Sequence, residues 1–353
     1  MLLEGIFAAA TTPFYPDERV YFRKLEYNVA RLSMSALSGL VILGSTGEAV
    51  SLTDGESREV LRVAAEAAAA DKVLVAGVAR ESVRATLELA AAAADFGYDA
   101  VLVRNPSYYR QQLTDKALLT YYRTVADRSA LPVVLYSIPR FTEFEIPLQV
   151  VAELADHPNI LGLKDSSGKV ERIQAVVDAT RNAPKRTVTV TPVFEAVTGR
   201  MLKARPSEGG AATFVSAEGL AAGAAMATAP PVPALKTRTK EVGFQVLTGS
   251  PSTMLESLEA GATGAVLAFA TCAPQTCQEV YTAWKEHDRK LAAERQAHIS
   301  HASSVIGNQF GIAGLKAACD FNGYYGGYPR LPLLPLEAAG RAKVEELLAE
   351  IRN

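Results

Sequence analysis

A lysine inside an apolar stretch is the residue of this chain best suited to covalent chemistry. Lys164 lies in ILGLKDSS (160–167), where the four preceding residues are apolar or glycine. Apolar surroundings favour the neutral amine of a lysine, which can attack a ketone or an aldehyde. The imine that forms accepts the electron pair of a neighbouring C–C bond as that bond breaks. The alternative is a lysine at a strand end that extends to solvent or pairs with Asp165.

A tyrosine on the preceding apolar run could supply a proton to the same chemistry. Tyr136 lies in PVVLYSIP (132–139). Because side chains alternate along a strand, Tyr136 shares a face with Val134, and Lys164 shares one with Ser166. If both faces point into one interior, the phenol can move a proton to or from a substrate oxygen near the amine. The alternative is an aromatic ring that only fills the core.

A short turn offers groups that suit a carboxylate. Ser45 and Thr46 lie in LGSTGE (43–48), where two glycines let the backbone approach a ligand closely. The segment lacks the GK[ST] ending of a phosphate-binding loop, so its hydroxyl and amide groups fit a carboxylate better than a nucleotide. An ordinary tight turn is the alternative, and Glu48 is interpreted as a structural carboxylate.

The elements that must position these residues repeat along the chain. Short apolar runs, each followed by a segment with helical periodicity, begin at residues 6, 39, 72, 99, 132, 160, 244 and 264. Runs that are apolar at nearly every position are typical of parallel strands covered on both faces. Eight such units predict a (β/α)8 TIM barrel, in which reactive side chains lie at the carboxyl ends of the strands. A doubly wound open sheet is the rival fold, but no GxGxxG follows the first run.

One gap between runs is much longer than the others and predicts an insertion of about 60 residues (183–242) between the sixth helix and the seventh strand. At that point of a barrel it emerges at the amino ends of the strands, away from the chemistry, as an element of stability or assembly. A rival register makes TVTVTP (187–192) the seventh strand and GGAATFVS (209–216) the eighth. The predicted division is a barrel over 1–272 and a helical C-terminal region over 273–353.

Composition excludes several classes of protein. The 353 residues carry 36 Lys plus Arg against 38 Asp plus Glu, a net charge of −2, which gives no basic surface for nucleic acid or an anionic membrane. No apolar run reaches the ~18 residues of a membrane span. The start, MLLEGIFAAATTPF, contains Glu4 and lacks the basic segment of a secretion signal, so we expect a cytoplasmic protein.

The metal-binding residue types are sparse. Three cysteines without CxxC spacing, Cys272, Cys277 and Cys319, fit reduced and buried thiols. His298 and His301 lie three apart on a predicted helix without a third ligand nearby. We therefore predict no metal site.

Four motifs in this order resemble the dihydrodipicolinate synthase and N-acetylneuraminate lyase family of class I aldolases. They are GSTGE (44–48), NPSYYR (105–110), YSIP (136–139) and GLKDSSG (162–168). The segment 244–266 and the tail FGIAGLKAACDFNGYYGGYPRLPL (310–333) are also similar to the family. The tail is most similar to 4-hydroxy-2-oxoglutarate aldolase, and the resemblance spans nearly all of the chain outside the insertion.

The resemblance implies a role for each matching residue. Lys164 would form a Schiff base with the 2-oxo group of pyruvate or of a substrate that contains it. Tyr136 would be the acid and base, linked through Thr46 to Tyr108, which family members borrow from the neighbouring subunit. The remaining substrate-binding positions are Ser45 and Thr46 at the carboxylate, with Ser166 and Gly249 nearby. The family needs no cofactor and no metal, and it forms homotetramers built from tight dimers.

Departures from the family pattern bear on the substrate. Dihydrodipicolinate synthases usually carry an arginine two residues after the proline of YxxP, and here that residue is Phe141. Arg140 points to the other side if the chain is extended, and Glu143 replaces a common glycine. We therefore expect an aldolase that joins or separates pyruvate and an aldehyde. The alternatives are 4-hydroxy-tetrahydrodipicolinate synthase and a non-catalytic ligand-binding homologue. A pyridoxal-phosphate enzyme that uses Lys164 is a third alternative, and the absence of a phosphate-binding loop from the sequence weighs against it.

Overall fold

Eight parallel strands close into a barrel, in the order β1-β12-β11-β6-β5-β4-β3-β2. The computed structural model describes residues 1–203, 213–214, 227–228 and 235–351. The barrel strands coincide with the eight predicted runs, so the predicted TIM barrel is confirmed and the open sheet is wrong. Their bounds are β1 (Gly5–Ala9), β2 (Gly39–Ile42), β3 (Val73–Gly77), β4 (Ala100–Arg104), β5 (Val133–Ser137), β6 (Ile160–Asp165), β11 (Gln245–Thr248) and β12 (Gly264–Leu267).

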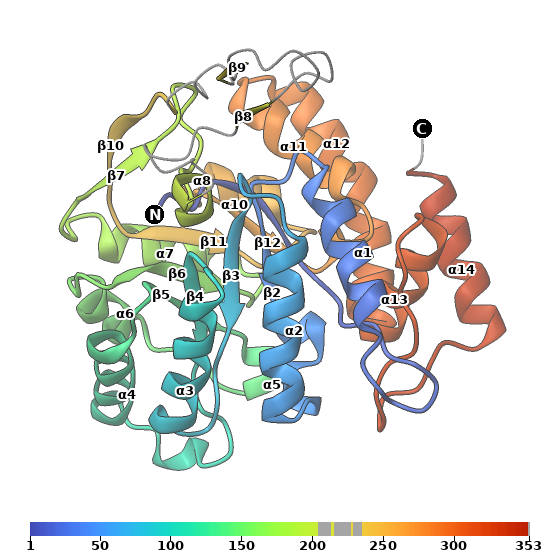
Figure 1. Ribbon diagram of the computed structural model, residues 1–353, viewed down its shortest axis with the longest axis horizontal. Helices are drawn as coiled ribbons and strands as arrows, with labels where there is room; N and C mark the ends of the chain where they lie inside the picture. The colour runs from blue at the N-terminus through green and yellow to red at the C-terminus, as the bar shows by residue number, and fades with distance from the viewer. Residues whose placement is uncertain (204–212, 215–226, 229–234, 352–353) are drawn as a thin grey trace.

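Helices follow the strands and surround the barrel (Figure 1). Two begin at the residues whose types predict a helix start. The hydroxyl of Thr53 accepts from the amide of Glu56, whose carboxylate accepts from the Thr53 amide, and Ser82 caps the next helix. The surrounding helices are α1 (Phe22–Ser33), α2 (Asp54–Ala67), α3 (Val83–Asp95), α4 (Asp115–Arg128), α6 (Leu148–Leu154), α7 (Val170–Thr180) and α10 (Met254–Glu259).

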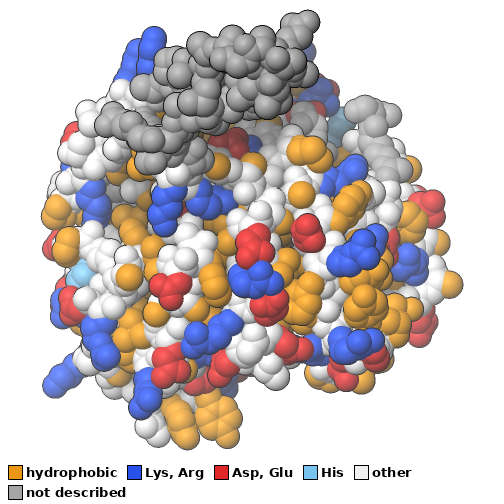
Figure 2. All heavy atoms as spheres, viewed as in Figure 1, with side chains coloured by type: hydrophobic (Ala, Val, Ile, Leu, Met, Phe, Trp, Pro, Cys, Tyr) orange, Lys and Arg blue, Asp and Glu red, His pale blue; other side chains and the backbone are white. Residues whose placement is uncertain are grey.

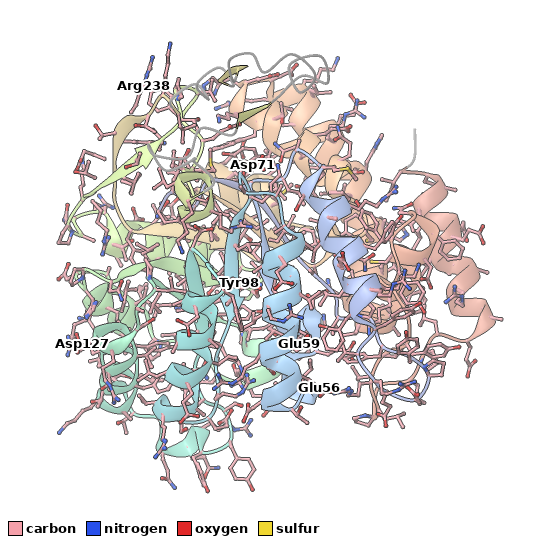
Figure 3. All side chains as sticks on the ribbon, viewed as in Figure 1. Glu56, Glu59, Asp71, Tyr98, Asp127 and Arg238 are labelled. Atoms are coloured by element: carbon pink, nitrogen blue, oxygen red, sulfur yellow. The ribbon has the colours of Figure 1, made fainter. Side chains whose placement is uncertain are left out.

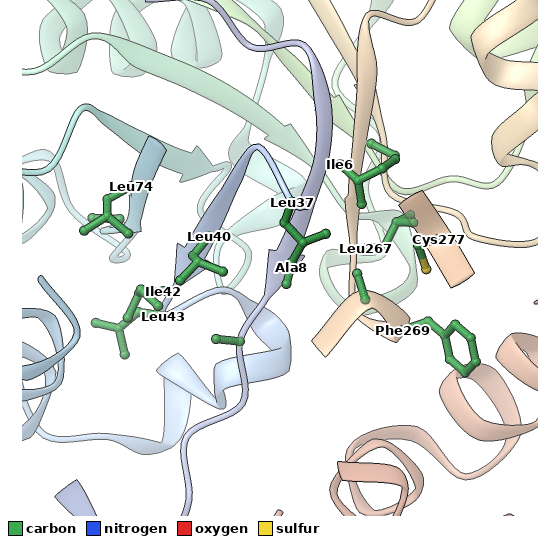
Figure 4. Packing of buried hydrophobic residues seen from close by; sticks show 14 of the residues in the cluster. Ile6, Ala8, Leu37, Leu40, Ile42, Leu43, Leu74, Leu267, Phe269 and Cys277 are labelled. Carbon is green, nitrogen blue, oxygen red and sulfur yellow. The ribbon is translucent and has the colours of Figure 1, made fainter. Parts of the chain in front are cut away.

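Alternation along each strand divides the core into two layers. One set of side chains packs between strands and helices, and Figure 4 shows part of it, including Ile6, Ala8, Leu40, Ile42 and Leu74. The other set fills the interior of the barrel. It includes Phe7, Val41, Val75, Leu102, Val134, Tyr136, Leu247 and Val266. Tyr136 is thus a member of the interior layer.

The described parts of the insertion lie at the amino ends of the barrel strands (Figure 1). β7 (Arg186–Val190) forms a two-stranded antiparallel sheet with β10 (Arg238–Val242) outside the barrel, so the rival register is wrong. Of GGAATFVS, only 213–214 lie within the described residues, where β8 (Thr213–Phe214) pairs with β9 (Ala227–Thr228). α8 (Gly199–Lys203) is fixed by the amide of Gly199, which donates to Asp99 in front of β4.

The C-terminal region contains α11 (Pro274–Lys285), α12 (Arg289–Ser303), a π-helical turn over 304–309, α13 (Gly311–Phe321) and α14 (Ala338–Ala349). The sequence predicts one helical stretch over 274–297. The structure has two helices there, because α11 ends at Lys285 and the backbone of His287 has a φ of 62°, outside the range of an α-helix. Residues 322–337 are not helical either, and Tyr328 pairs with Phe14. The division into regions at residue 272 stays a prediction.

The surface agrees with the balanced composition. Figure 2 shows acidic and basic side chains interspersed on the visible face. No helix in the described part of the chain is long and apolar enough to cross a membrane.

Candidate active site

Lys164 and Tyr136 face each other inside the barrel. The two residues pair across β5 and β6, and Lys164 also pairs with the interior Leu247 of β11. Only 4% of Lys164 is exposed, and its Nζ lies 4.3 Å from the centroid of the Tyr136 ring. Within the described residues, this Nζ makes no hydrogen bond or ion pair. The amine is thus buried near the carboxyl end of the interior and is free to meet a ligand.

Asp165 is not the partner of Lys164. Its carboxylate accepts from the amide of Ser167 at 2.9 Å and from the hydroxyl at 2.5 Å, and Arg172 Nε lies 3.4 Å away. Neighbouring residues of a strand point to opposite faces, so these bonds lie on the outer side of β6. The interpretation of Lys164 as an exposed or Asp165-paired lysine is wrong.

The GSTGE segment forms a 3₁₀ turn over Ser45–Gly47 directly beyond β2. Ser45 Oγ lies 3.5 Å from the hydroxyl oxygen of Tyr136. No carbonyl in the described part of the chain accepts from the amides of Ser45 and Thr46, which open the turn. The expected contact of Tyr136 with Thr46 is replaced by the contact with Ser45. Successive side chains of a 3₁₀ turn are rotated by a third of a circle, so a turn that directs Ser45 toward the Tyr136 hydroxyl directs Thr46 elsewhere.

Ser166 and Gly249 meet beside Lys164, where β6 and β11 end. The amide of Gly249 donates to the carbonyl of Asp165 at 2.6 Å, and that of Ser166 donates to Ser137 at 2.9 Å. A Cβ at position 249 would lie 1.9 Å from Ser166 Oγ and 2.9 Å from Ser166 Cβ, so any side chain here would displace Ser166. The structure therefore brings together Lys164, Tyr136, Ser45, Ser166 and Gly249 at the carboxyl ends of the strands.

Tyr108 lies at the rim of the barrel, and 80% of it is exposed. Its ring packs edge-on against Tyr109, with centroids 5.0 Å apart. The backbone amides of Ser107 and Tyr108 donate to Glu81 at 2.9 and 3.0 Å, and Arg104 donates to the same carboxylate at 3.0 Å. Burial raises the pKa of Glu81, but these bonds outweigh burial and lower it. Sequence reasoning missed Glu81, because nothing near it in the chain predicts the loop that it holds.

A cavity of about 890 Å³ opens beside Tyr108, between the loops that follow β2, β3, β4 and β5. Phe141 lines it and is 59% exposed. Each arginine of its lining is bonded to a carboxylate, Arg80 to Asp54, Arg104 to Glu81 and Arg110 to Glu143. The rim thus presents an aromatic ring and arginines that are already paired.

Arg140 is turned away from this cavity, but not for the reason expected. The chain is helical over Pro139–Thr142 (α5) rather than extended, because Pro139 starts the helical turn at its first position. The Arg140 guanidinium donates to the side-chain oxygen of Asn308 at 2.9 Å and to its carbonyl at 2.6 Å.

Comparison with known proteins agrees with this geometry. A model of the dihydrodipicolinate synthetase family matches residues 2–188 and 231–351. The chain belongs to this family. The unmatched internal segment, 189–230, falls inside the insertion, as expected for a segment added to the common barrel.

Members of the family are similar to the chain over their whole length. L-threo-3-deoxy-hexylosonate aldolase of Hypocrea jecorina is 30% identical over 98% of this chain and 95% of its own. 4-Hydroxy-tetrahydrodipicolinate synthase of Natronomonas pharaonis is 26% identical over 99% and 98%. YagE of E. coli K12, solved in complex with pyruvate, has a TM-score of 0.77 at 23% identity over 100% and 99%. Membership of the family makes the chain a pyruvate-dependent class I aldolase or lyase.

A second buried lysine, Lys316, contacts the last residue of the GSTGE segment. Lys316 of α13 is 1% exposed, and its Nζ lies 2.6 Å from the carboxylate of Glu48. The other oxygen of Glu48 accepts from the amide of Arg330 at 2.8 Å, so Glu48 is a structural carboxylate, as the sequence indicates. Sequence reasoning missed Lys316, although a lysine within the apolar GIAGLKAAC (311–319) is the same signal that singles out Lys164.

The remaining candidates do not form a cluster. His298 and His301 are both exposed on α12, and the three cysteines are free and buried. Among the described residues, no group of three or more His, Cys, Asp and Glu side chains could hold a metal ion.

Proposed function

We propose that Lys164 binds pyruvate, or a 2-oxo acid that contains it, as a Schiff base. The observation that carries this proposal is the buried Nζ, 4.3 Å from the Tyr136 ring centroid and bonded to nothing else in the described chain. The interior of the barrel also excludes most water, which favours imine formation over the hydrated ketone.

Tyr136 is proposed to move the protons of the reaction. The Lys164 nitrogen attacks C2, and the phenol of Tyr136 protonates the departing hydroxyl as water leaves. The C3–C4 bond then breaks, and its electron pair forms the enamine while the phenolate takes the proton of the C4 hydroxyl. The aldehyde departs, C3 accepts a proton, and water releases pyruvate and restores the amine.

The other site residues are proposed to hold the substrate. The two free amides and the hydroxyls of Ser45 and Thr46 suit the carboxylate of the 2-oxo acid. Ser166 and Gly249 border the amine on the opposite side. Tyr108 is proposed to complete the site of a second copy of the chain, since it is exposed at the rim and does not reach Tyr136 of its own chain.

We propose an uncharged, hydroxylated aldehyde as the second reactant. The arginines of the rim cavity are paired with carboxylates, and Phe141 and Glu143 are poor ligands for an anion. The relative in Hypocrea jecorina is named as an aldolase of a 3-deoxy sugar acid, which contains such a fragment. A 2-oxo-3-deoxy sugar acid therefore fits the rim better than the dicarboxylate 4-hydroxy-2-oxoglutarate, which the tail alone favours.

The second candidate function is 4-hydroxy-tetrahydrodipicolinate synthase, the name of several relatives at 26% identity over nearly the whole chain. Its second substrate, aspartate semialdehyde, carries a charged carboxylate. To bind this carboxylate, one of the rim arginines would have to release the carboxylate with which it is paired in the structure.

Borohydride trapping tests the Schiff base. Reduction in the presence of pyruvate is expected to add a stable mass to the protein, located at Lys164 by peptide mass spectrometry. Lys164→Ala should remove the adduct. Lys169→Ala is the matched control, because Lys169 lies only five residues after Lys164 but is exposed and ion-paired to Glu145. No adduct, or one that persists in Lys164→Ala, contradicts the proposal.

A substrate screen with pyruvate release as the readout separates the candidate reactions. We expect 2-oxo-3-deoxy sugar acids to be cleaved faster than 4-hydroxy-2-oxoglutarate or N-acetylneuraminate. Preferred condensation of pyruvate with aspartate semialdehyde would establish the synthase instead. An imine without turnover on any of these would favour a non-catalytic binding homologue.

We infer a homotetramer built from dimers, as the family resemblance implies. Light scattering of the purified protein tests the assembly. A mixture of Tyr108→Phe and Lys164→Ala chains tests whether the tyrosine acts across subunits, since mixed dimers would then regain one complete site. A cytoplasmic location stays a prediction for cell fractionation.

A further inference from the structure

A buried ion pair connects the C-terminal region to the turn that carries Ser45 and Thr46. Besides Glu48, the Lys316 ammonium donates to the carbonyls of Thr12 at 2.8 Å and Tyr328 at 2.6 Å. Two of the three N–H donors of the ammonium are used by these carbonyls, and the Glu48 carboxylate lies 2.6 Å from it as an ion pair. The ammonium also lies 4.5 Å from the centroid of the Phe14 ring. Lys316 is therefore a fixed cation and not a second nucleophile.

Glu48 is the last residue of GSTGE and is held from three directions. Its backbone has a φ of 53°, in the left-handed region that a non-glycine residue adopts only where its surroundings hold it. The preceding carbonyl of Gly47 accepts from the hydroxyl of Thr12 at 2.7 Å. Lys316 and the Arg330 amide bind the two carboxylate oxygens. The end of the turn is thus fixed by groups from α13 and from the segment that follows it.

The orientation of the turn depends on these contacts. The direction of the Ser45 and Thr46 amides is set by the backbone of the turn. The Ser45 side chain contacts Tyr136 at 3.5 Å, which is too weak a bond to fix the turn. Removal of the Lys316 charge would leave the buried Glu48 carboxylate without its ion-pair partner. The turn would then have to move so that Glu48 could reach water or another donor.

We propose that Lys316 is a positioning residue for the carboxylate of the 2-oxo acid, acting through Glu48 on the Ser45–Gly47 turn. This rests on the carboxylate role proposed for Ser45 and Thr46. The C-terminal region then contributes to substrate binding without touching the substrate.

The test compares two ligands of the Schiff base site, pyruvate and its uncharged amide, pyruvamide. For Lys316→Met we expect the pyruvate concentration for half-maximal borohydride trapping to rise tenfold or more. The value for pyruvamide should change less than threefold, since its binding does not depend on a charged group. Lys240→Met is the matched control, because Lys240 pairs with Glu4 at the opposite end of the barrel.

A purely structural role of Lys316 predicts a different result. Lys316→Met would then melt at a lower temperature but, while folded, would bind pyruvate as the wild type does, which would overturn the proposal. An equal loss of both ligands would also overturn it. If Lys316→Met does not fold, Glu48→Gln, which keeps the shape of the side chain, is judged by the same criteria. Absence of trapping in the wild type would instead refute the proposed function.

Discussion

The Lys164 amine and the Tyr136 phenol share one layer of the barrel because β5 and β6 pair them at the same register. The Lys164 Nζ lies over the face of the Tyr136 ring, 4.3 Å from its centroid. The hydroxyl extends past the ring toward Ser45. The ring therefore positions the amine while the hydroxyl remains available for proton transfer.

Tyr136→Phe keeps the ring beside Lys164 and removes only the hydroxyl. Loss of a general acid and base is expected to lower kcat by a factor of roughly 100 to 10,000, while the imine forms more slowly but can still be trapped. Steady-state cleavage of the best substrate of the screen measures this. Tyr122→Phe is the control, since its buried hydroxyl has no partner among the described residues. A wild-type kcat for Tyr136→Phe would exclude the proposed role.

An ion pair between Glu56 and Arg330 makes the stability of the molecule depend on pH. Hydrogen bonds from Arg330 lower the pKa of Glu56 to about 2, from 4.5. Because the pKa of Glu56 is lower in the folded than in the unfolded chain, the ionised carboxylate stabilises the fold at pH values above about 4.5. This contribution is lost as the pH falls from about 4.5 to about 2. The difference in unfolding free energy between wild type and Glu56→Gln should therefore shrink between pH 6 and pH 3 in urea titrations.

Glu59→Gln provides the comparison for this pH dependence. Glu59 lies on the same helix (Figure 3) but pairs with Arg62 at the surface. Solvent screens such a pair, so its removal should change stability less at every pH. A pH-independent difference for Glu56→Gln would contradict the assignment of the ion pair.

Only part of the residue-scale site can be predicted from the sequence. Lys164 and Tyr136 are recognisable because period-2 alternation fixes which side chains share a face. Glu48 and Lys316 are 268 positions apart, and no local pattern pairs them. The exchange of Thr46 for Ser45 as the contact of Tyr136 depends on the rotation of one 3₁₀ turn, which sequence does not determine.

The loop after β4 is an element with little structure of its own, organised by one carboxylate. Glu81, from the loop after β3, accepts from the amides of Ser107 and Tyr108 and from Arg104. These bonds replace the backbone pairing that a regular element would supply. The position of Tyr108 at the rim thus depends on a neighbouring loop.

Glu81→Ala should loosen this loop. Loss of the shared acceptor frees two backbone amides, so trypsin is expected to cleave after Arg110 several times faster in the folded protein. Glu88→Ala is the control, because Glu88 pairs with Arg84 on the exposed surface of α3. Equal cleavage of wild type and Glu81→Ala would show that other contacts hold the loop.

Elements covered on both faces are the ones that sequence predicts well. The barrel strands are apolar at nearly every position. TVTVTP instead alternates, because the pair of β7 and β10 has one buried face and one exposed face. The break at His287 and the helical turn at Pro139 are not predicted, because each depends on the backbone conformation at a single position rather than on a repeating pattern.

In the whole molecule, the candidate site and the described part of the insertion lie at opposite ends of the barrel. The site lies where the strands end, and the described insertion binds where they begin. Arg186 of β7 donates from one guanidinium to the carbonyls of Ala155, His157 and Ile160 in front of β6. Burial lowers the pKa of this arginine, which reflects its withdrawal from water.

Arg186→Ala should weaken the fold without affecting the site. Hydrogen bonds from a charged donor to these carbonyls predict a loss of about 2 kcal/mol in the free energy of unfolding, measured in urea. Arg181→Ala, which removes an exposed pair with Asp178, should change stability by less than about 0.5 kcal/mol. A higher pyruvate concentration for half-maximal trapping in Arg186→Ala would indicate coupling between the two ends.

The antiparallel ribbon of β7 and β10 shares no ladder with the barrel. It can therefore open as a separate cooperative unit while the eight strands stay closed. In native-state hydrogen exchange, the amides of 186–190 and 238–242 are expected to exchange through this local opening, well before those of β2 and β3. The β7–β10 pair would then unfold before the barrel does, and its unfolding would leave the site at the other end of the barrel intact.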